Sequence, residues 1–335
     1  MNLQGKKYLV TGGAGFIGSE LCRQLQAAGA AVHIVDNLAN GKRENVAEIL
    51  TPTCQLHTTD IRDLDQMKAL MVGCDGLFHL ACLGVRHSIH SPMENHDVNA
   101  TATLNLLRLA HEGGVPRFVY VSSSEVYGTA QSVPQPEAHP TYPMTVYGSA
   151  KLAGECYTRA FHRTYGYATV VIRPFNSYGP RSHHEGDSGE VIPKFLLRTL
   201  AGKPMVIFGD GSQTRDFTFV SDTARGILEA GLADATIGET VNIGSGFEIT
   251  IQALAEEVRE VTGRADAEII HEEDRPGDVL RLYADTTKAQ GLIGFAPRVS
   301  LREGLSQLLA WYQSQGHSAE ELLQNEIVKN WEVKA

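Results

Sequence analysis

The order of apolar and polar residues divides the first half of the chain into alternating strands and helices. Short apolar runs without polar alternation are typical of strands that are buried on both faces. Five such runs lie at 8–10, 32–35, 76–80, 118–121 and 169–172. Helical spacing occupies 19–28, 64–71, 95–112 and 147–164. This alternation predicts an α/β fold with a doubly wound, Rossmann-type parallel sheet.

The second half is less regular. Its patterns predict helices at 192–200, 220–233, 249–262 and 300–315, and short strands at 205–208, 240–243 and 268–271. Glycine and proline cluster at 179–190 and 202–212, which favours loops over a ligand. We therefore expect a nucleotide-binding domain over 1–175 that also receives segments near 215–245. Residues 176–335 should form a smaller, partly interleaved α/β lobe.

Composition narrows the range of partners. The chain is 42% hydrophobic and 20% charged, with a net charge of −10, which argues against nucleic acid or an anionic membrane surface as the main partner. The five cysteines are scattered and form no C-x-x-C pair. With neither a targeting segment nor a membrane-length apolar run, we expect a cytoplasmic protein with reduced thiols. His183-His184-Glu185 lacks a spacing fixed by a helix or strand, so no metal site is predicted.

The first apolar run leads into a glycine motif. Gly12, Gly15 and Gly18 follow it with the spacing G-x-x-G-x-x-G, just before a helical pattern. Glycines there let the backbone approach a pyrophosphate at the helix N-terminus. The next strand ends at Asp36, whose carboxylate would accept hydrogen bonds from ribose hydroxyls and repel a 2′-phosphate. The predicted cofactor is therefore NAD rather than NADP.

A second group of residues suggests acid–base chemistry. Tyr147 and Lys151 are four residues apart on a predicted helix, so they share one face. A neighbouring ammonium and a positive nicotinamide ring would lower the tyrosine pKa by roughly 1–3 units, making it a usable base. The run 122–125, Ser-Ser-Ser-Glu, follows the strand at 118–121. It should face the ligand crevice, because strands in open parallel sheets end there.

Together these motifs resemble the extended short-chain dehydrogenase/reductase family, specifically its nucleotide-sugar epimerases and dehydratases of the UDP-glucose 4-epimerase type. The resemblance runs from the glycine motif to Arg275-Pro276-Gly277-Asp278 and covers nearly the whole chain. It also implies a homodimer formed through the helices at 95–112 and 147–164.

The resemblance implies a role for each matching residue. The cofactor would be bound by Gly12, Gly15, Phe16, Ile17, Asp36, Asn37, Asp60, Ile61, Leu80, Ala81, Cys82, Asn99, Ser122, Tyr147, Lys151 and Phe175. The catalytic residues would be Ser123, Tyr147, Lys151 and Glu125. The substrate would contact Arg86, Ser123, Ser124, Asn176, Phe208, Arg215, Arg275 and Asp278. For Arg86, contact with the sugar, contact with a carboxylate and a surface ion pair remain alternatives.

The family motifs do not settle the reaction. In each branch Tyr147 would take the 4-hydroxyl proton while C4 gives hydride to NAD, and the 4-keto sugar then decides the outcome. Ser124 occupies the position at which glucose dehydratases of the family have an Asp. Glu125, by contrast, matches a glutamate of the family's dehydratases and decarboxylases. We expect a 4-epimerase for a UDP-hexose or UDP-hexuronate. A nucleotide-sugar 4,6-dehydratase and a UDP-glucuronate decarboxylase are the alternatives. A non-catalytic NAD-binding regulator is more remote, because Tyr147 and Lys151 are both present.

Overall fold

The computed structural model describes every residue except 187, 276–278, 330 and 332–335. A seven-stranded sheet in the order β11-β6-β5-β4-β1-β2-β3 forms the larger lobe, and all of its pairings are parallel. Its strands are β1 Lys7–Thr11, β2 Ala31–Asp36, β3 Cys54–Thr58, β4 Gly76–His79, β5 Phe118–Val121, β6 Thr169–Pro174 and β11 Thr240–Ile243. The predicted fold class, a Rossmann-type parallel sheet, is confirmed.

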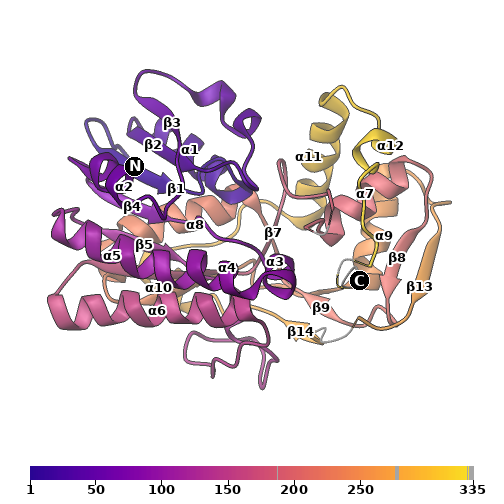
Figure 1. The fold of residues 1–335 in the computed structure, drawn as a ribbon. Coiled ribbons are helices and arrows are strands. Elements are labelled where there is room, and N and C mark those ends of the chain that lie inside the picture. Colours follow the sequence, from indigo (N-terminus) through magenta and orange to yellow (C-terminus); the bar gives the residue numbers. More distant parts are fainter. Residues whose placement is uncertain (187, 276–278, 330, 332–335) are drawn as a thin grey trace.

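Helices cover both faces of this sheet (Figure 1). On one face, α1 (Phe16–Ala27) packs against α8 (Val220–Leu232), and α10 (Thr287–Ile293) adjoins β11. The other face carries α2 (Leu64–Met71), α5 (Ala102–Glu112) and α6 (Val146–Tyr165). Because α8 and β11 come from the second half of the chain, the two lobes are interleaved.

The smaller lobe has its own apolar core around Phe195, Leu254 and Leu308. Its helices are α7 Val191–Leu200, α9 Ile251–Thr262, α11 Leu301–Ser314 and α12 Ala319–Leu322. Its strands are β8 Met205–Phe208 with β13 Ile269–Glu272, and β9 Thr214–Arg215 with β12 Ile249–Thr250 and β14 Arg281–Leu282. A further pair, β7 Asn176–Tyr178 and β10 Phe217–Phe219, lies where the lobes meet.

Several elements differ from the sequence-based prediction. Strand β3 was not expected, because it is an edge strand that carries the exposed Gln55 and the half-buried His57. The helix expected over 95–112 consists of α4 (Pro92–His96), a π-helical turn at Asp97–Thr101 and α5. Before it comes the short α3 (Val85–His90). Single 3-10 turns occupy Arg43–Asn45, Ala47–Ile49, Ser124–Val126 and Asp234–Thr236.

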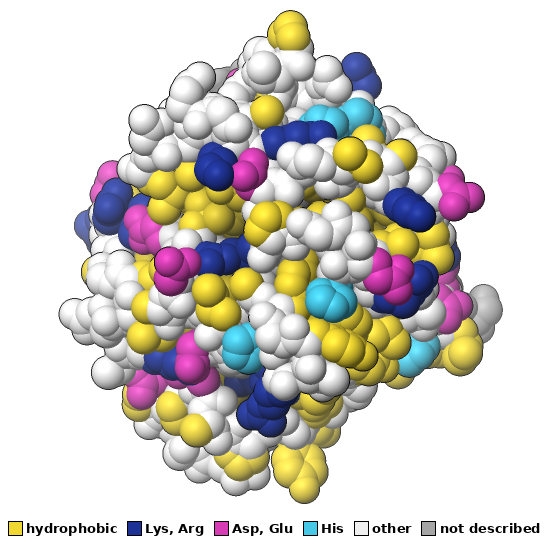
Figure 2. Space-filling model, turned by 90° about the vertical axis from the view of Figure 1, so that its left-hand side faces the viewer, with side chains coloured by type: hydrophobic (Ala, Val, Ile, Leu, Met, Phe, Trp, Pro, Cys, Tyr) yellow, Lys and Arg dark blue, Asp and Glu magenta, His cyan; other side chains and the backbone are white. Residues whose placement is uncertain are grey.

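Neither positive nor negative charge dominates the face shown in Figure 2, where acidic and basic side chains are interspersed among apolar ones. Within the described part of the chain, no helix combines the length and the apolar character needed to cross a membrane.

Candidate active site

A cavity of about 1000 Å³ lies between the lobes, at the carboxyl ends of the parallel strands. Its walls include the glycine turn after β1, the start of α6 and residues of the smaller lobe, among them Arg215 and Arg275. The cavity therefore joins nearly all of the motifs singled out in the sequence, and its size is at the upper end for small-molecule sites.

The glycine turn is shaped by close backbone contacts. Gly12 has φ +68°, and a Cβ atom there would lie 2.7 Å from the Ala81 nitrogen. A Cβ atom on Gly18 would lie 2.1 Å from the Gly12 oxygen, so neither position tolerates a side chain. Gly15 is the N-cap of α1, and in the described structure no side chain caps that helix. The helix N-terminus, with Phe16 and Ile17 in the cavity wall, thus fits a pyrophosphate.

Asp36 ends β2 beside this turn. Its carboxylate accepts the backbone N–H groups of Ala14 (3.0 Å) and Leu38 (2.9 Å), and its side chain borders the cavity. Burial raises the pKa of Asp36, although these two hydrogen bonds oppose that effect. Since a carboxylate has about four lone-pair sites, it can still accept bonds from ribose hydroxyls.

Two of the predicted cofactor residues, Asn37 and Asp60, are hydrogen-bonded to each other beside the cavity. The Asn37 amide donates to the Asp60 carboxylate (3.0 Å), which also receives the guanidinium of Arg62. Hydrogen bonding from Arg62 lowers the pKa of Asp60 to about 2. Ile61, next in the chain, borders the same part of the cavity.

The loop after β4 forms the cavity floor with Leu80, Ala81 and Cys82. Asn99 lies behind this loop in the π-helical turn and is 2% exposed. Its amide oxygen accepts the Leu83 N–H at 2.9 Å, and its amide nitrogen donates to the Leu83 oxygen at 2.9 Å. Asn99 therefore fixes the loop that carries Leu80, Ala81 and Cys82 from behind, and the structure does not place Asn99 in the cavity wall.

Tyr147 and Lys151 enter the cavity from the first turns of α6. Thr145 caps this helix by accepting the Gly148 N–H at 3.0 Å, which sets the position of Tyr147. The Lys151 ammonium donates to the Val121 oxygen at 2.9 Å and lies 6.0 Å from the centre of the Tyr147 ring. The two residues share one helix face, as predicted.

The protein's own groups raise the pKa of Tyr147, so the lowered pKa expected with a nicotinamide ring beside it stays a prediction. Burial raises its pKa well above the usual value, the nearby Cys82 and Glu125 raise it further, and a hydrogen bond with Ser123 lowers it. The Lys151 ammonium is bonded to a backbone oxygen instead of the phenol, so the predicted lowering does not arise from the protein's own groups.

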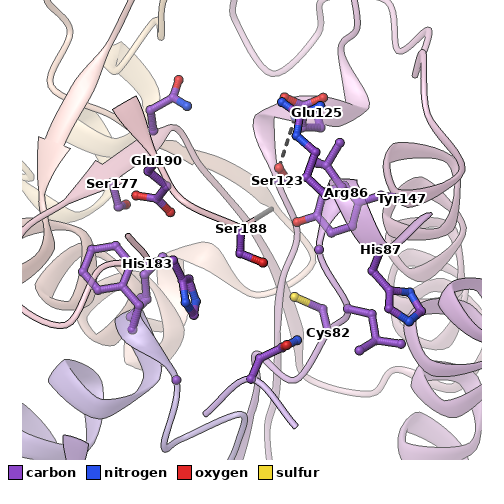
Figure 3. Close-up of a pocket in the computed structure, with 18 of the residues that line it drawn as sticks. Cys82, Arg86, His87, Ser123, Glu125, Tyr147, Ser177, His183, Ser188 and Glu190 are labelled. Atoms are coloured by element: carbon purple, nitrogen blue, oxygen red, sulfur yellow. Dashed lines mark hydrogen bonds between the residues drawn. The ribbon is translucent and has the colours of Figure 1, made fainter. Parts of the chain in front are cut away.

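Ser123, Ser124 and Glu125 form the turn that follows β5. The Ser123 hydroxyl accepts the Glu125 N–H at 3.2 Å (dashed in Figure 3). Figure 3 shows Ser123, Glu125 and Arg86 beside Tyr147 on one side of the cavity. Arg86 comes from α3. Ser124 is 4% exposed but still contributes to the cavity wall.

A buried ion pair contacts Ser122, the residue just before this turn. It was not predicted from the sequence. The Ser122 hydroxyl donates to Glu155 at 2.6 Å, and Arg173 donates to both carboxylate oxygens of Glu155 at 2.8 and 2.6 Å. The Glu155 side chain is fully buried and the Arg173 side chain is 3% exposed. The helical spacing of Tyr147, Lys151 and Glu155 was the signal that could have revealed it.

The opposite wall carries a second carboxylate that the sequence did not single out. Glu190, the N-cap of α7, points into the cavity across from Glu125 (Figure 3). Burial raises its pKa to about 8. Its position shortly before the helix predicted at 192–200 was the only available signal. His183 and Ser188 lie on the same side.

Four more of the predicted substrate residues, Asn176, Phe208, Arg215 and Arg275, contribute to the cavity wall. Phe175, which was predicted to bind the cofactor, also lines it. The Arg215 guanidinium donates to the Thr214 and Val279 oxygens at 2.8 and 2.6 Å. Asp278 lies outside the described residues. Among those that are described, no three His, Cys, Asp or Glu residues are placed to hold a metal ion.

Known proteins resemble the chain over nearly its whole length. The family model described as GDP-mannose 4,6 dehydratase matches residues 9–308. The structure of a Thermotoga maritima UDP-glucose 4-epimerase with UDP-glucose is 35% identical, has a TM-score of 0.86, and is matched over 92% of this chain and 98% of that one.

Two further relatives are named for other reactions. A dTDP-glucose 4,6-dehydratase from Streptomyces venezuelae with NAD bound is 34% identical, with a TM-score of 0.86 and coverage of 92% and 97%. UDP-glucuronic acid decarboxylase 2 of Arabidopsis thaliana is 35% identical over 309 residues, which are 90% of this chain and 67% of that protein. Identity is therefore nearly equal, 34–35%, to relatives named for three different reactions. The predicted family resemblance is confirmed. The prediction of NAD as the cofactor is also confirmed, because a solved relative has NAD bound.

Proposed function

Because the chain belongs to the extended short-chain dehydrogenase/reductase family of nucleotide-sugar enzymes, we propose that it is an NAD-dependent nucleotide-sugar 4-epimerase. Its substrate is a UDP-hexose or a UDP-hexuronate, and the reaction passes through a transient 4-keto sugar. The similarity to a UDP-glucose 4-epimerase with UDP-glucose bound supports this proposal, but it does not separate epimerisation from dehydration or decarboxylation.

One feature of the site favours epimerisation over dehydration. The turn beside Tyr147 offers two hydroxyl groups and one carboxylate, because Ser123 and Ser124 precede Glu125. Dehydration must remove a proton from C5 and protonate the leaving oxygen on C6, a task that the family's dehydratases divide between adjacent acids. Epimerisation needs neither step, so this turn suits it better.

The proposed mechanism uses groups already in position. Tyr147 accepts the proton of the sugar 4-hydroxyl and later returns it. Ser123, which shares a hydrogen bond with Tyr147, orients that hydroxyl. Lys151 supplies positive charge 6.0 Å from the tyrosine ring. Arg215 and Arg275 offer charge-assisted bonds to the diphosphate at the far end of the cavity.

The glycine turn, Asp36 and the floor at Leu80–Cys82 would hold NAD, which when bound supplies reversible hydride transfer at C4. Epimerisation also requires the 4-keto sugar to rotate before hydride returns to its other face. We further propose that the protein is a cytoplasmic homodimer assembled through α5 and α6.

Glu125 favours a nucleotide-sugar 4,6-dehydratase as the second candidate, because it lies beside Tyr147 where an acid–base residue would act at C5. A UDP-glucuronate decarboxylase is the third. A non-catalytic NAD-binding regulator would not need Tyr147 and Lys151 in this arrangement.

The test is a panel of UDP-, TDP-, GDP- and CDP-sugars with products identified by mass and NMR. Unchanged mass with inverted configuration at C4 supports the proposal. Loss of water or carbon dioxide refutes it in favour of the matching alternative. No turnover of any sugar by protein that retains NAD would indicate the regulator.

Replacing Glu125 tests the same choice independently. Glu125→Gln should change the turnover of an epimerase by less than about threefold, whereas loss of an acid–base group costs about 10²–10⁴-fold. Glu44→Gln, on the exposed 3-10 turn Arg43–Asn45, serves as the control. A collapse of activity in Glu125→Gln alone would favour the dehydratase.

A further inference from the structure

The C-terminal part of the chain returns to the cavity after the region matched by the family model. That match ends at residue 308, whereas α12 begins at Ala319 and the chain then runs back across the smaller lobe. Figure 1 shows this segment passing α7 and running toward α9. We call residues 323–329 together with Trp331 the C-terminal strap.

Three contacts attach the strap to the cavity wall. The Gly186 N–H donates to the Asn325 oxygen at 2.9 Å. Arg198 of α7 pairs with Glu326 at 2.8 Å, and the two side chains are 11% and 7% exposed. Lys194, one turn earlier on α7, donates to the Ile327 oxygen at 2.7 Å. These contacts fix the strap against the helix whose N-cap is Glu190.

The strap contributes side chains to the cavity itself. Glu326, Val328 and Trp331 belong to its wall, together with Phe208 and Arg275. The Trp331 ring meets the Phe208 ring edge to face, with centres 4.6 Å apart. The Arg275 guanidinium lies 5.0 Å from the centre of the Trp331 ring and 5.7 Å from that of Phe208. Two aromatic rings and one cation thus meet at the end of the cavity that we assign to the nucleotide.

We propose that the strap is part of the substrate site and that Trp331 closes its nucleotide end. The indole provides an aromatic surface for the base of a nucleoside diphosphate, and its ring face holds the Arg275 guanidinium where it can meet the diphosphate. This inference rests on the proposed function, because it takes the occupant to be the nucleoside diphosphate of a sugar nucleotide. It adds a binding element from beyond the region that the family model matches.

The competing explanation is that the strap only covers the apolar core of the smaller lobe. Leu323 does pack into that core and is 4% exposed. A purely structural strap would lower the melting temperature when Trp331 is replaced but leave nucleotide affinity unchanged. A strap that binds nucleotide would change the affinity, whatever happens to the melting temperature.

The chain has only two tryptophans, Trp311 and Trp331, which permits a direct test. Trp311 lies on α11 and packs against Tyr312 in the core of the smaller lobe. In the NAD-loaded Trp311→Phe protein, Trp331 is the sole tryptophan, and titration with uridine diphosphate should give a saturable change in its emission. The matched Trp331→Phe protein, which reports only Trp311, should give none.

Affinity provides the second measurement. By calorimetry, Trp331→Ala should weaken the binding of uridine diphosphate about tenfold, whereas Trp331→Phe keeps an aromatic ring and should stay within about threefold of the wild type. In turnover assays, the loss in Trp331→Ala should appear in KM and leave kcat nearly unchanged.

Two results would overturn the proposal, and they are distinguishable. If uridine diphosphate binds Trp331→Ala as tightly as the wild type and the emission of Trp331 does not respond, the strap is structural and the proposed function stands. If uridine diphosphate fails to bind the wild-type protein at all, the uridine-nucleotide substrate is wrong, and the strap proposal fails with it.

Discussion

At the scale of single residues, the arrangement around Tyr147 combines a buried phenol with a nearby cation. Its hydroxyl is the group that can exchange a proton with a sugar hydroxyl at this place, since Lys151 is bonded to the Val121 oxygen. Burial raises the tyrosine pKa, so the free protein keeps the phenol protonated over the whole neutral range. The positive charge needed to lower that pKa must then come in part from what binds beside it.

Tyr147→Phe should therefore remove turnover while NAD binding persists. The substitution deletes only the hydroxyl and leaves the glycine turn and Asp36 unchanged, so turnover should fall by at least about 10²–10⁴-fold. Turnover is followed by NMR, and NAD is quantified after the purified protein is denatured. Retention of a tenth of the activity would show that another group handles the proton.

Glu190 leads to a prediction on pH. Burial raises its pKa to about 8, and burial lowers the pKa of Lys194, one turn away, to about 8. As pH rises through 8, the carboxyl group gains negative charge and the ammonium loses positive charge. Both changes disfavour an anionic sugar nucleotide, so KM should rise roughly fivefold, which corresponds to about 1 kcal/mol of repulsion.

The matched variants separate the two groups. In Glu190→Gln only the contribution of Lys194 remains, so the rise in KM above pH 8 should be shallower. The exposed Glu44→Gln should follow the wild type. A wild-type KM that is flat from pH 6.5 to about 9 would show that Glu190 is not a neutral acid facing the substrate.

At this scale, the sequence identified residues whose chemistry depends on local spacing. Gly12, Gly15 and Gly18 are defined by a turn, and Tyr147 and Lys151 by one helical repeat. Glu190 and Trp331 could not be found in this way, because they reach the cavity through the packing of distant segments. A lone carboxylate before a helix and a tryptophan near the chain end carry no spacing that distinguishes them from surface residues.

At the scale of elements, α6 connects catalysis to stability. One face of this helix carries Tyr147 and Lys151 toward the cavity and, two turns later, Glu155 into the interior. Glu155 binds Ser122 at the end of β5 and Arg173 of β6, so one helix fixes two neighbouring strands. The positions of the catalytic groups therefore depend on an ion pair that takes no part in the reaction.

Breaking this ion pair should be costly. Burial alone would raise the pKa of Glu155, but hydrogen bonds and the charge of Arg173 leave it lowered. Glu155→Gln leaves the buried Arg173 without its anion, which costs about 3–5 kcal/mol of unfolding free energy. Urea unfolding would measure this loss. The control is Glu112→Gln, which breaks the exposed pair between Glu112 and Arg108 and should lie within about 0.5 kcal/mol of the wild type.

The sign of the pH effect follows from the lowered pKa. The stabilisation by Glu155 is fully present above its unfolded value of 4.5 and is lost as pH falls below that value. The difference in stability between wild type and Glu155→Gln should therefore shrink on acidification below about pH 4.5. A difference that is small at pH 7, or that grows on acidification, would contradict this account of the ion pair.

Strands could be predicted from the sequence where both of their faces are buried, because their residues then form a continuous apolar run. The central strands β1, β4, β5 and β6 are apolar on both faces, and the sequence pattern located each of them. Edge strand β3 and the two-residue strands β9, β12 and β14 have no such pattern, because partners distant in sequence define them. The π-helical turn at Asp97–Thr101 interrupts a pattern that otherwise looks like one helix.

At the scale of the whole molecule, the site exists only because two lobes meet. The larger lobe supplies the predicted cofactor groove and the proton-transfer residues, and the smaller lobe supplies arginines and the C-terminal strap. The alternation of strands and helices was enough to predict the sheet. It could not predict how the later segments close over the sheet, since loops and short strands in that lobe are positioned by tertiary contacts.

The proposed 4-epimerase reaction can be tested most directly by incubating the NAD-loaded protein with UDP-glucose, and separately with UDP-glucuronate, in deuterated water. A 4-epimerase returns the same hydride to C4, so the proton NMR spectrum should show inversion at C4 with every carbon-bound hydrogen retained and the mass unchanged. Deuterium at C5 with loss of water, or loss of carbon dioxide, would contradict epimerisation and identify the reaction as dehydration or decarboxylation.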